Sequence, residues 1–319
     1  MKKKTLGKSS LEVAPLMLGG NVFGWTADEK TSFSILDAFV DAGFDFVDTA
    51  DVYSHWVPGH QGGESEAVIG KWFKQGGKRS KVILATKVGA QMGSDTTKNG
   101  LKKAYILREV EDSLRRLQTD YIDLYQTHYD DAETSVEEPL EAYQELIKQG
   151  KVRLIGASNF TPARLEAALK ASDAHGYPRY QSLQPHYNLV EREIFEKELG
   201  PLCQREGLGV IPYFSLAAGF LSGKYRSEAD LAKSPRGQGL KKYLNEKGLR
   251  VLTALDEVSA RHDSDPAGVA LAWLAAQPVV TAPIASATSV AQLKSLLSGV
   301  QLALTAEDIA VLDKASAWE

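Results

Sequence analysis

The chain has 319 residues, of which 43% are hydrophobic and 24% are charged, and its formal net charge of −4 comes from interleaved charges of both signs. This distribution argues against a nucleic-acid partner, because phosphate binding needs a concentrated basic face. Cys203 is the only cysteine, which excludes an intramolecular disulfide and fits a reducing compartment. The longest apolar stretch, residues 269–276, is far below the ~20 residues of a membrane-spanning helix. We therefore expect a cytoplasmic protein with no membrane partner.

Near the start of the chain, residues 6–13 predict a short β-hairpin whose turn is formed by Gly7 and Lys8. Apolar segments of strand length then alternate with segments of helical periodicity, and Thr31 is the predicted cap of the first helix. The predicted strands are residues 16–18, 46–48, 82–86, 121–126, 153–157, 180–183, 210–213 and 279–284. The predicted helices are residues 31–42, 66–73, 106–117, 136–148, 162–170, 199–206, 249–261, 266–276, 290–297 and 305–315.

This alternation predicts the fold. Strands joined by helical crossovers pair in parallel, and near-continuous apolar strands such as 82–86 suit a sheet that is buried on both faces. The even spacing favours a closed (β/α)8 TIM barrel over an open sheet, with an N-terminal hairpin and long loops at the strand ends. No change of composition marks a second domain, so residues 1–319 are predicted to form one barrel domain. Residues 224–247 interrupt the alternation and are interpreted as a mobile loop.

Four polar side chains follow or end predicted strands. Asp48 ends the strand at 46–48, Tyr53 lies five residues later in a loop, Lys87 follows the strand at 82–86, and His128 follows the strand at 121–126. Each alone has a structural interpretation, as a cap, a surface aromatic, a solvated strand end or a satisfied polar residue. Together they indicate an active site, because a barrel brings the carboxyl ends of its strands around one mouth.

These residue types suit proton donation to a carbonyl oxygen. A tyrosine hydroxyl has an ordinary pKa of ~10, and a nearby ammonium such as that of Lys87 favours the phenolate and lowers this pKa. Asp48 would hold the ammonium in place, and His128 would hydrogen-bond and orient a carbonyl. The result is a general acid of the kind that hydride delivery to a carbonyl carbon requires. The remaining histidines show no zinc-site spacing, and we expect no metal.

The sequence resembles the aldo-keto reductase superfamily over nearly its whole length. The matching motifs are DAGFDFVDTADVYS (41–54), ATKVG (85–89), YIDLYQTH (121–128), KVRLIGASNF (151–160), LQPHYNL (183–189), GVIPYFSLAAGFLSGKY (209–225) and PIASATSVAQL (283–293). The resemblance implies a TIM barrel that binds an extended nicotinamide cofactor without a metal. It implies a catalytic tetrad of Asp48, Tyr53, Lys87 and His128, with Tyr53 as the proton donor.

The resemblance also implies positions for the cofactor. Ser158, Asn159 and Gln184 correspond to residues that bind the nicotinamide carboxamide, and Tyr213 to the aromatic that stacks on the nicotinamide ring. The segment that wraps the pyrophosphate corresponds to Phe214, Ser215, Leu216, Gly219, Leu221, Gly223 and Lys224. The positions beside the adenosine ribose correspond to Ser286, Thr288 and Gln292. Thr288 replaces a base that commonly binds the 2′-phosphate of NADP, although Lys294 is near in sequence, so NADP(H) is favoured and NAD(H) stays possible.

The substrate pocket is predicted to contain aromatic residues from the strand-end loops, namely Phe23, Trp25, Trp56 and Tyr129, although loop packing would explain them equally well. These residues favour an aromatic or alicyclic carbonyl. The resulting hypothesis is an NAD(P)(H)-dependent oxidoreductase that reduces an aldehyde or ketone, either aromatic, alicyclic or sugar-like. One alternative is a regulatory subunit that senses the cofactor with little turnover, and another is a dehydrogenase that works mainly in the oxidative direction. Nothing in the sequence indicates an oligomeric state.

Overall fold

A computed structural model describes residues 2–233 and 237–318. Within this part of the chain the central element is an eight-stranded sheet in which each strand pairs in parallel with its neighbours, in the order β10-β3-β4-β5-β6-β7-β8-β9. The strands are β3 (Met17–Gly19), β4 (Phe46–Asp48), β5 (Ile83–Val88), β6 (Ile122–Thr127), β7 (Val152–Ser158), β8 (Ser182–Gln184), β9 (Gly209–Val210) and β10 (Ile284–Ala285).

The two ends of this sheet meet. Val210 in β9 forms a parallel bridge with Val280, which precedes β10. The backbone N–H of Thr281 donates to the carbonyl of Val210 at 2.8 Å, and that of Ile284 donates to Pro212 at 2.9 Å. The curled sheet and its helices form the (β/α)8 barrel that the sequence predicted.

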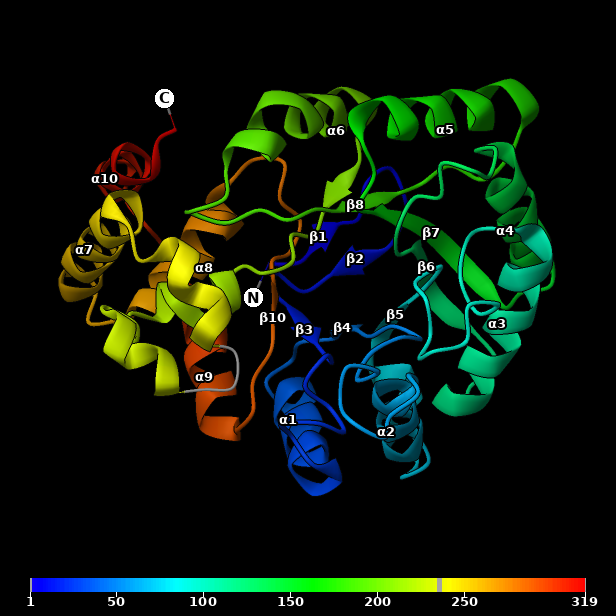
Figure 1. Ribbon diagram of the computed structural model, residues 1–319, viewed down its shortest axis with the longest axis horizontal. Helices are drawn as coiled ribbons and strands as arrows, with labels where there is room; N and C mark the ends of the chain where they lie inside the picture. The colour runs from blue at the N-terminus through cyan, green and yellow to red at the C-terminus, as the bar shows by residue number, and fades with distance from the viewer. Residues whose placement is uncertain (1, 234–236, 319) are drawn as a thin grey trace.

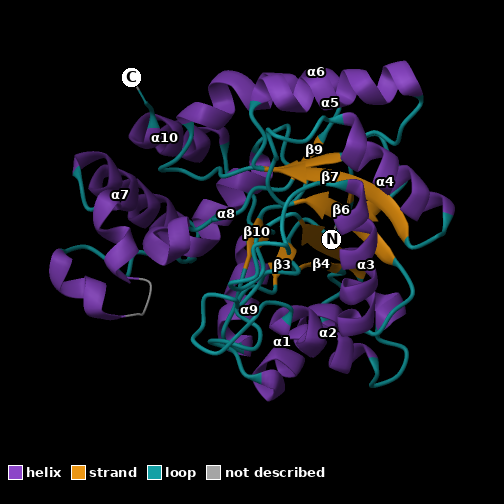
Figure 2. Cartoon of the chain, turned by 45° about the vertical axis from the view of Figure 1, so that its right-hand side comes forward, coloured by secondary structure: helices purple, strands orange, loops and turns teal. Residues whose placement is uncertain are grey.

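Helices form the outer layer around the sheet (Figure 1 and Figure 2). They are α1 (Glu29–Asp41), α2 (Glu64–Phe73), α3 (Lys103–Leu117), α4 (Glu137–Lys148), α5 (Pro162–His175), α6 (Gly200–Glu206), α7 (Glu246–Arg261), α8 (Pro266–Ala276), α9 (Val290–Gly299) and α10 (Ala306–Ser316). The last of these, α10, packs against α7 at the side of the barrel. Among the described residues, no helix has the length and apolar character needed to cross a membrane.

The interior of the barrel holds its own apolar cluster, to which Met17, Phe46 and Leu124 contribute from neighbouring strands. The antiparallel hairpin β1 (Lys4–Thr5) and β2 (Glu12–Val13) adds Leu6 and Val13 to this cluster. The hairpin therefore closes one end of the barrel. Its first strand lies before the predicted range of residues 6–13 and its second strand at the end of that range, so the pairing is not beside a tight turn at Gly7. The opposite end of the barrel, where the parallel strands finish, is the end at which barrel proteins place their functional sites.

Two local predictions were wrong. Helix α1 is capped by Asp28, whose carboxylate accepts the backbone N–H of Thr31 at 2.8 Å, so the helix begins before Thr31 rather than at it. The predicted loop 224–247 contains the 3-10 helices η4 (Glu228–Lys233) and η5 (Gly237–Tyr243), which are anchored by buried residues such as Leu231 and Leu240. Residues 234–236 of this range lie outside the described part of the chain.

Candidate active site

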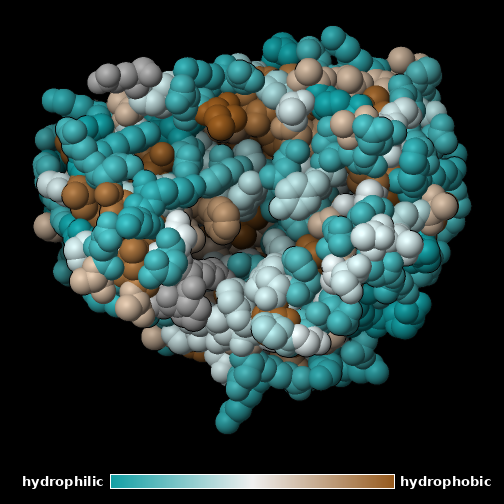
Figure 3. All heavy atoms as spheres, in the orientation of Figure 1, coloured by the Kyte–Doolittle hydropathy of each residue, from teal (hydrophilic) through white to brown (hydrophobic). Residues whose placement is uncertain are grey.

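A cavity of about 1260 Å³ opens at the carboxyl ends of the strands, and the space-filling view shows a hollow near the centre of this face (Figure 3). Asp48 ends β4, Ser158 ends β7 and Gln184 ends β8, and all three line the cavity. His128 follows β6 by one residue and also lines it. The parallel sheet thus brings together the strand-end residues that the sequence singled out.

Lys87 is completely buried and does not line the cavity, but it contacts Asp48 and Tyr53, which do. Its ammonium Nζ donates to Asp48 Oδ2 at 2.7 Å, to Tyr53 Oη at 2.7 Å and to the carbonyl of Thr49 at 2.9 Å. An ammonium group has three protons, so these three acceptors satisfy the charged form. Tyr53 in turn donates to Asp48 Oδ2 at 3.1 Å. The predicted contact between Asp48, Tyr53 and Lys87 is therefore present as a closed triangle of hydrogen bonds.

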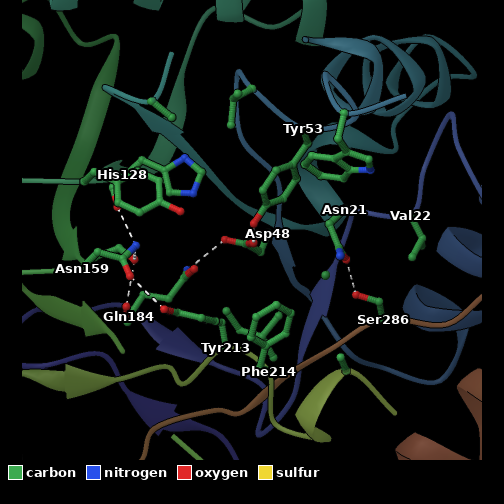
Figure 4. Close-up of a pocket in the computed structure, with 18 of the residues that line it drawn as sticks. Asn21, Val22, Asp48, Tyr53, His128, Asn159, Gln184, Tyr213, Phe214 and Ser286 are labelled. Atoms are coloured by element: carbon green, nitrogen blue, oxygen red, sulfur yellow. Dashed lines mark hydrogen bonds between the residues drawn. The ribbon is translucent and has the colours of Figure 1, made fainter. Parts of the chain in front are cut away.

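The second oxygen of Asp48 connects this triangle to the neighbouring strands. Asp48 Oδ1 accepts from Gln184 Nε2 at 3.1 Å (Figure 4). It also accepts from Gln126 Nε2 at 3.3 Å, and Gln184 Nε2 lies 3.3 Å from Gln126 Oε1. Sequence reasoning missed Gln126, which is fully buried within β6. The available signal was a glutamine inside an apolar strand, two residues before His128.

Burial sets the protonation of these groups. It raises the pKa of the Tyr53 hydroxyl well above its ordinary value, and the charge of Asp48 adds to this effect. The expected lowering by Lys87 is thus outweighed, because a phenolate here would be desolvated and would face a carboxylate. Burial likewise lowers the pKa of Lys87, against the opposing effect of Asp48. Tyr53 is therefore held as the neutral phenol, which is the form that can donate a proton.

His128 stands beside Tyr53, with the two rings edge to face at 6.0 Å between centroids. Burial lowers the pKa of His128 well below its ordinary value, and the charges of Lys87 and His55 act in the same direction. Its Nδ1 is buried and has no hydrogen-bond partner among the described residues. A neutral imidazole carries one N–H, and this ring can present that donor to a carbonyl oxygen in the cavity.

The residues expected to hold the nicotinamide form one connected group. Tyr213 Oη donates to Asn159 Oδ1 at 2.8 Å, Asn159 Nδ2 donates to Ser158 Oγ at 3.1 Å, and Ser158 Oγ donates to the carbonyl of Gln184 at 2.8 Å. Figure 4 shows this group at the same pocket as Tyr53 and His128. Asn159 has a positive φ of 54°, a sparsely populated conformation that clusters at ligand sites.

The segment after Tyr213 has an unusual backbone. Phe214, Ala217 and Ala218 have φ values of 52°, 48° and 55°, and Gly219 has 103°. Backbone N–H groups in such left-handed turns can form a concave anion site, which fits a pyrophosphate group. Within this segment the cavity is lined by Phe214, Ser215, Leu216, Ala218 and Gly219. The segment also contains the 3-10 helix η3 (Ala217–Ser222).

Three other predicted cofactor positions lie away from the cavity wall. The side chain of Leu221 is fully buried in the main hydrophobic core, and this residue does not line the cavity. Gly223 and Lys224 do not line the cavity. Gly223 instead ends η3 with a left-handed φ of 76°.

The far end of the cavity holds the positions beside the predicted ribose. Ser286 Oγ lies 2.5 Å from Asn21 Oδ1. The backbone N–H and the hydroxyl of Thr288 both donate to Gln292 Oε1, at 2.9 and 3.0 Å. Lys294 is exposed and does not line the cavity. Among the described residues, no lysine or arginine lines it.

Aromatic side chains form the outer wall. Trp25 meets Trp56 edge to face at 5.6 Å, Trp56 lies 6.1 Å from the ring of Tyr53, and Tyr129 stacks on His128 at 4.8 Å. Trp56 and Tyr129 are 42% and 52% exposed, which leaves aromatic surface open to a ligand. Trp25, Trp56 and Tyr129 line the cavity, as predicted.

The prediction for Phe23 was wrong. This side chain is completely buried in the apolar cluster beneath α1, and its hydrogen bonds are made by the backbone: the carbonyl accepts from Ser54 Oγ at 3.2 Å and the N–H donates to Gly20 at 3.0 Å. Sequence reasoning did not assign Phe214 to the substrate wall, although its ring is 49% exposed and lines the cavity. Among the described residues, no group of three or more His, Cys, Asp or Glu side chains is arranged to hold a metal ion.

The model of the aldo/keto reductase family matches residues 15–317. The chain belongs to the aldo/keto reductase family. It is 38% identical to the uncharacterized oxidoreductase YrpG of Bacillus subtilis, with 98% of this chain and 95% of YrpG covered. It is 35% identical to the aldo-keto reductase YhdN of the same organism, over 91% of this chain and 85% of YhdN. It is 31% identical to the norsolorinic acid reductase of Aspergillus flavus, over 98% of this chain and 80% of that relative. This aldo/keto reductase is therefore an oxidoreductase of a family that reduces carbonyl groups.

Proposed function

We propose that this aldo/keto reductase reduces an aldehyde or a ketone to the alcohol, with a nicotinamide nucleotide as cofactor and Tyr53 as the general acid. The observation that carries the proposal is the hydrogen-bonded triangle of Asp48, Lys87 and Tyr53 beside a neutral His128, at the base of the cavity. This group contains a proton donor, a fixed positive charge and a neutral N–H, and it lies within an aldo/keto reductase chain.

The residues of the chain then act as follows. His128 and Tyr53 donate hydrogen bonds to the carbonyl oxygen and orient it. A reduced nicotinamide held by Ser158, Asn159, Gln184 and Tyr213 would supply the hydride for the carbonyl carbon. The negative charge that develops on oxygen is taken up by the Tyr53 proton, because an alkoxide is a stronger base than a phenolate even when burial raises the pKa of the phenol. Lys87 Nζ, 2.7 Å from Tyr53 Oη, stabilises the phenolate that remains.

The cofactor contacts follow from the same geometry. Gln184 uses its Nε2 on Asp48 and Gln126, so its Oε1 is the group that would accept from the nicotinamide carboxamide, together with Ser158 and Asn159. Tyr213 would stack on the nicotinamide ring and fix which face of it meets the substrate. The left-handed backbone of residues 214–219 would bind the pyrophosphate.

NADP(H) is the proposed nucleotide, and Lys294 the proposed partner of its 2′-phosphate, with NAD(H) as the alternative that Thr288 leaves open. The test is the quenching of intrinsic fluorescence by NADPH and by NADH, in the wild type and in Lys294→Ala. A selective loss of NADPH affinity would support the proposal. An unchanged NADPH affinity would exclude Lys294, and a wild type that bound NADH more tightly than NADPH would favour NAD(H). Lys170→Ala, at an exposed lysine of α5, controls for a general effect of removing charge.

The proposed substrate is an aromatic or alicyclic carbonyl compound. The exposed faces of Trp56 and Tyr129 on either side of the catalytic residues support this class. A relative that is 31% identical carries the name norsolorinic acid reductase. The substrate in that name can be compared with other carbonyl compounds in an activity assay.

The decisive experiment measures consumption of NADPH and NADH with a simple aromatic aldehyde, for the wild type and for Tyr53→Phe. We expect turnover in the wild type and its loss in Tyr53→Phe by a factor of roughly 10²–10⁴, the usual contribution of a general acid. Cofactor affinity should stay unchanged, which separates lost chemistry from lost binding. If neither protein turned over any carbonyl in a broad panel while both bound cofactor, the regulatory alternative would replace the reductase.

A further inference from the structure

The backbone at Phe214 needs an explanation, because a bulky aromatic residue rarely adopts a left-handed conformation. Phe214 follows the Tyr213 ring and begins the segment that would bind the pyrophosphate. Such conformations persist only where the surroundings hold them. The carbonyl of Phe214 is held from two sides, by the N–H of Ala217 at 2.7 Å and by the side chain of Asn188 at 2.9 Å.

Asn188 is completely buried, and its hydrogen bonds fix the orientation of its side-chain amide. Its Oδ1 accepts the backbone N–H groups of Val190 at 2.9 Å and Glu191 at 3.1 Å. Because two donors face this atom, it must be the oxygen, and the nitrogen must face Phe214. Nδ2 therefore donates to the Phe214 carbonyl.

His186 completes the arrangement behind the Tyr213 ring. The two rings stack at 5.3 Å with an interplanar angle of 17°, and His186 meets Phe214 edge to face at 5.5 Å. His186 does not line the cavity, so it covers the face of Tyr213 that is turned away from the cofactor site. Its Nε2 lies 3.4 Å from Asn188 Nδ2, which as a donor requires an unprotonated Nε2 and hence a neutral ring.

We propose that Asn188 is a positioning residue for the cofactor: it holds Phe214 in its left-handed conformation and so sets the position of the Tyr213 ring and the pyrophosphate segment. The inference rests on the proposed nicotinamide function and assigns a role to a side chain that touches neither substrate nor cofactor. Since none of the hydrogen bonds of Asn188 involves Asp48, Lys87 or Tyr53, the effect falls on cofactor binding rather than on the chemical step.

The first test is Asn188→Asp, which keeps an oxygen for Val190 and Glu191 but replaces the donor to Phe214 with a repelling oxygen. Losing one such buried hydrogen bond predicts about a tenfold rise in the Kd of the reduced cofactor. The value of kcat at saturating cofactor should stay within about threefold, since the proton donor is untouched. Should Asn188→Asp fail to fold, Asn188→Ser is too short to reach Phe214 and carries the same expectation.

Ser172→Ala is the matched control for loss of buried hydrogen bonds. Ser172 Oγ lies 3.1 Å from the carbonyl of Ala168 in α5 and 3.0 Å from the carbonyl of Pro178 in the turn after it, and its single proton is shared between these two acceptors. This variant should lower the melting temperature and leave the Kd unchanged. If it weakened cofactor binding as much as Asn188→Asp does, a general loss of stability would explain both, and the assigned role would be overturned.

The coupling between Asn188 and Phe214 is tested by repeating Asn188→Asp in a Phe214→Gly background. Glycine adopts a φ of 52° without strain, so it no longer needs the Asn188 donor to hold it. We expect the effect of Asn188→Asp on the Kd to shrink to less than about twofold. An equal effect in both backgrounds would overturn the inference. A wild type that bound neither NADPH nor NADH would instead overturn the proposed function itself.

Discussion

The buried pair of Asp48 and Lys87 gives the sharpest test of what the site is for. Their side chains are 2% and 0% exposed, with 2.7 Å between Oδ2 and Nζ. Removing one partner of such a pair leaves an uncompensated buried charge and costs about 3–5 kcal/mol of unfolding free energy. We therefore expect Asp48→Asn and Lys87→Met each to destabilise the protein by about this amount.

The double variant Asp48→Asn/Lys87→Met should behave differently. It buries no charge, and the amide oxygen introduced at position 48 can still accept from Gln184 and Gln126. The carbonyl of Thr49 and the hydroxyl of Tyr53 lose their contacts with Lys87. Losing these contacts costs roughly 1–3 kcal/mol, well below the sum of the two single variants. Turnover should nevertheless fall in all three variants, because the phenolate of Tyr53 loses its counterion or the group that holds it.

The assay is urea unfolding followed by circular dichroism, together with carbonyl-dependent oxidation of the cofactor. Lys71→Met is the control, since Lys71 pairs with Glu29 at 2.6 Å but the two side chains are 57% and 49% exposed. It should cost no more than about 1 kcal/mol and leave turnover unchanged. Additive costs of the single variants would refute the coupling. A double variant that kept roughly a tenth or more of wild-type turnover would show that the pair is not needed for the chemistry, because a general acid alone contributes more than that.

Three further outcomes follow from the geometry. The raised pKa keeps Tyr53 protonated until the pH exceeds that pKa, so the rate of reduction should not fall with an apparent pKa below the ordinary tyrosine value of ~10. Such a fall in a pH profile would contradict this assignment of the acid. Trp56→Ala should raise KM for an aromatic aldehyde by up to about tenfold without changing that for a two-carbon aldehyde, and equal effects would remove Trp56 from the pocket. A Cβ on Gly299 would lie 2.2 Å from the Cα of Gly268, so Gly299→Ala should cost about 1–3 kcal/mol in thermal unfolding. Gly239→Ala, with nothing within 4 Å, should cost little, and equal losses would refute the close approach of α8 and α9.

The fold and the contacts among the proposed catalytic residues could be predicted because both depend on short-range signals. Continuous apolar strands separated by helices define a parallel barrel, and a barrel of that kind fixes where Asp48, Lys87 and His128 must meet. Tyr53 follows β4 by a few residues, too short a distance to leave the mouth. For these residues the position along the chain determines the position in space.

Other features depend on contacts between distant segments, which the spacing does not encode. Phe23 and Trp25 are neighbours in one loop, yet the first is buried in the core and the second lines the cavity. The predicted direction of the Tyr53 pKa shift was wrong. The shift depends on how completely burial removes water from the hydroxyl, and the order of residues does not reveal this. The contact of Asn188 could not be predicted either, because its partner Phe214 lies 26 residues away in sequence.

Asp48 links the two halves of the proposed reaction. Its Oδ2 holds Lys87 and the proposed proton donor Tyr53, and its Oδ1 holds Gln184, which would hold the carboxamide of the hydride donor. A carboxylate is rigid and planar, and its remaining acceptor position is occupied by Gln126. One buried group thereby positions both the proposed proton donor and the residue that would hold the hydride donor. A carbonyl placed between them would meet both once the Tyr53 hydroxyl turned from Asp48 Oδ2 toward it. That is the kind of preorganisation from which a reductase would gain its rate.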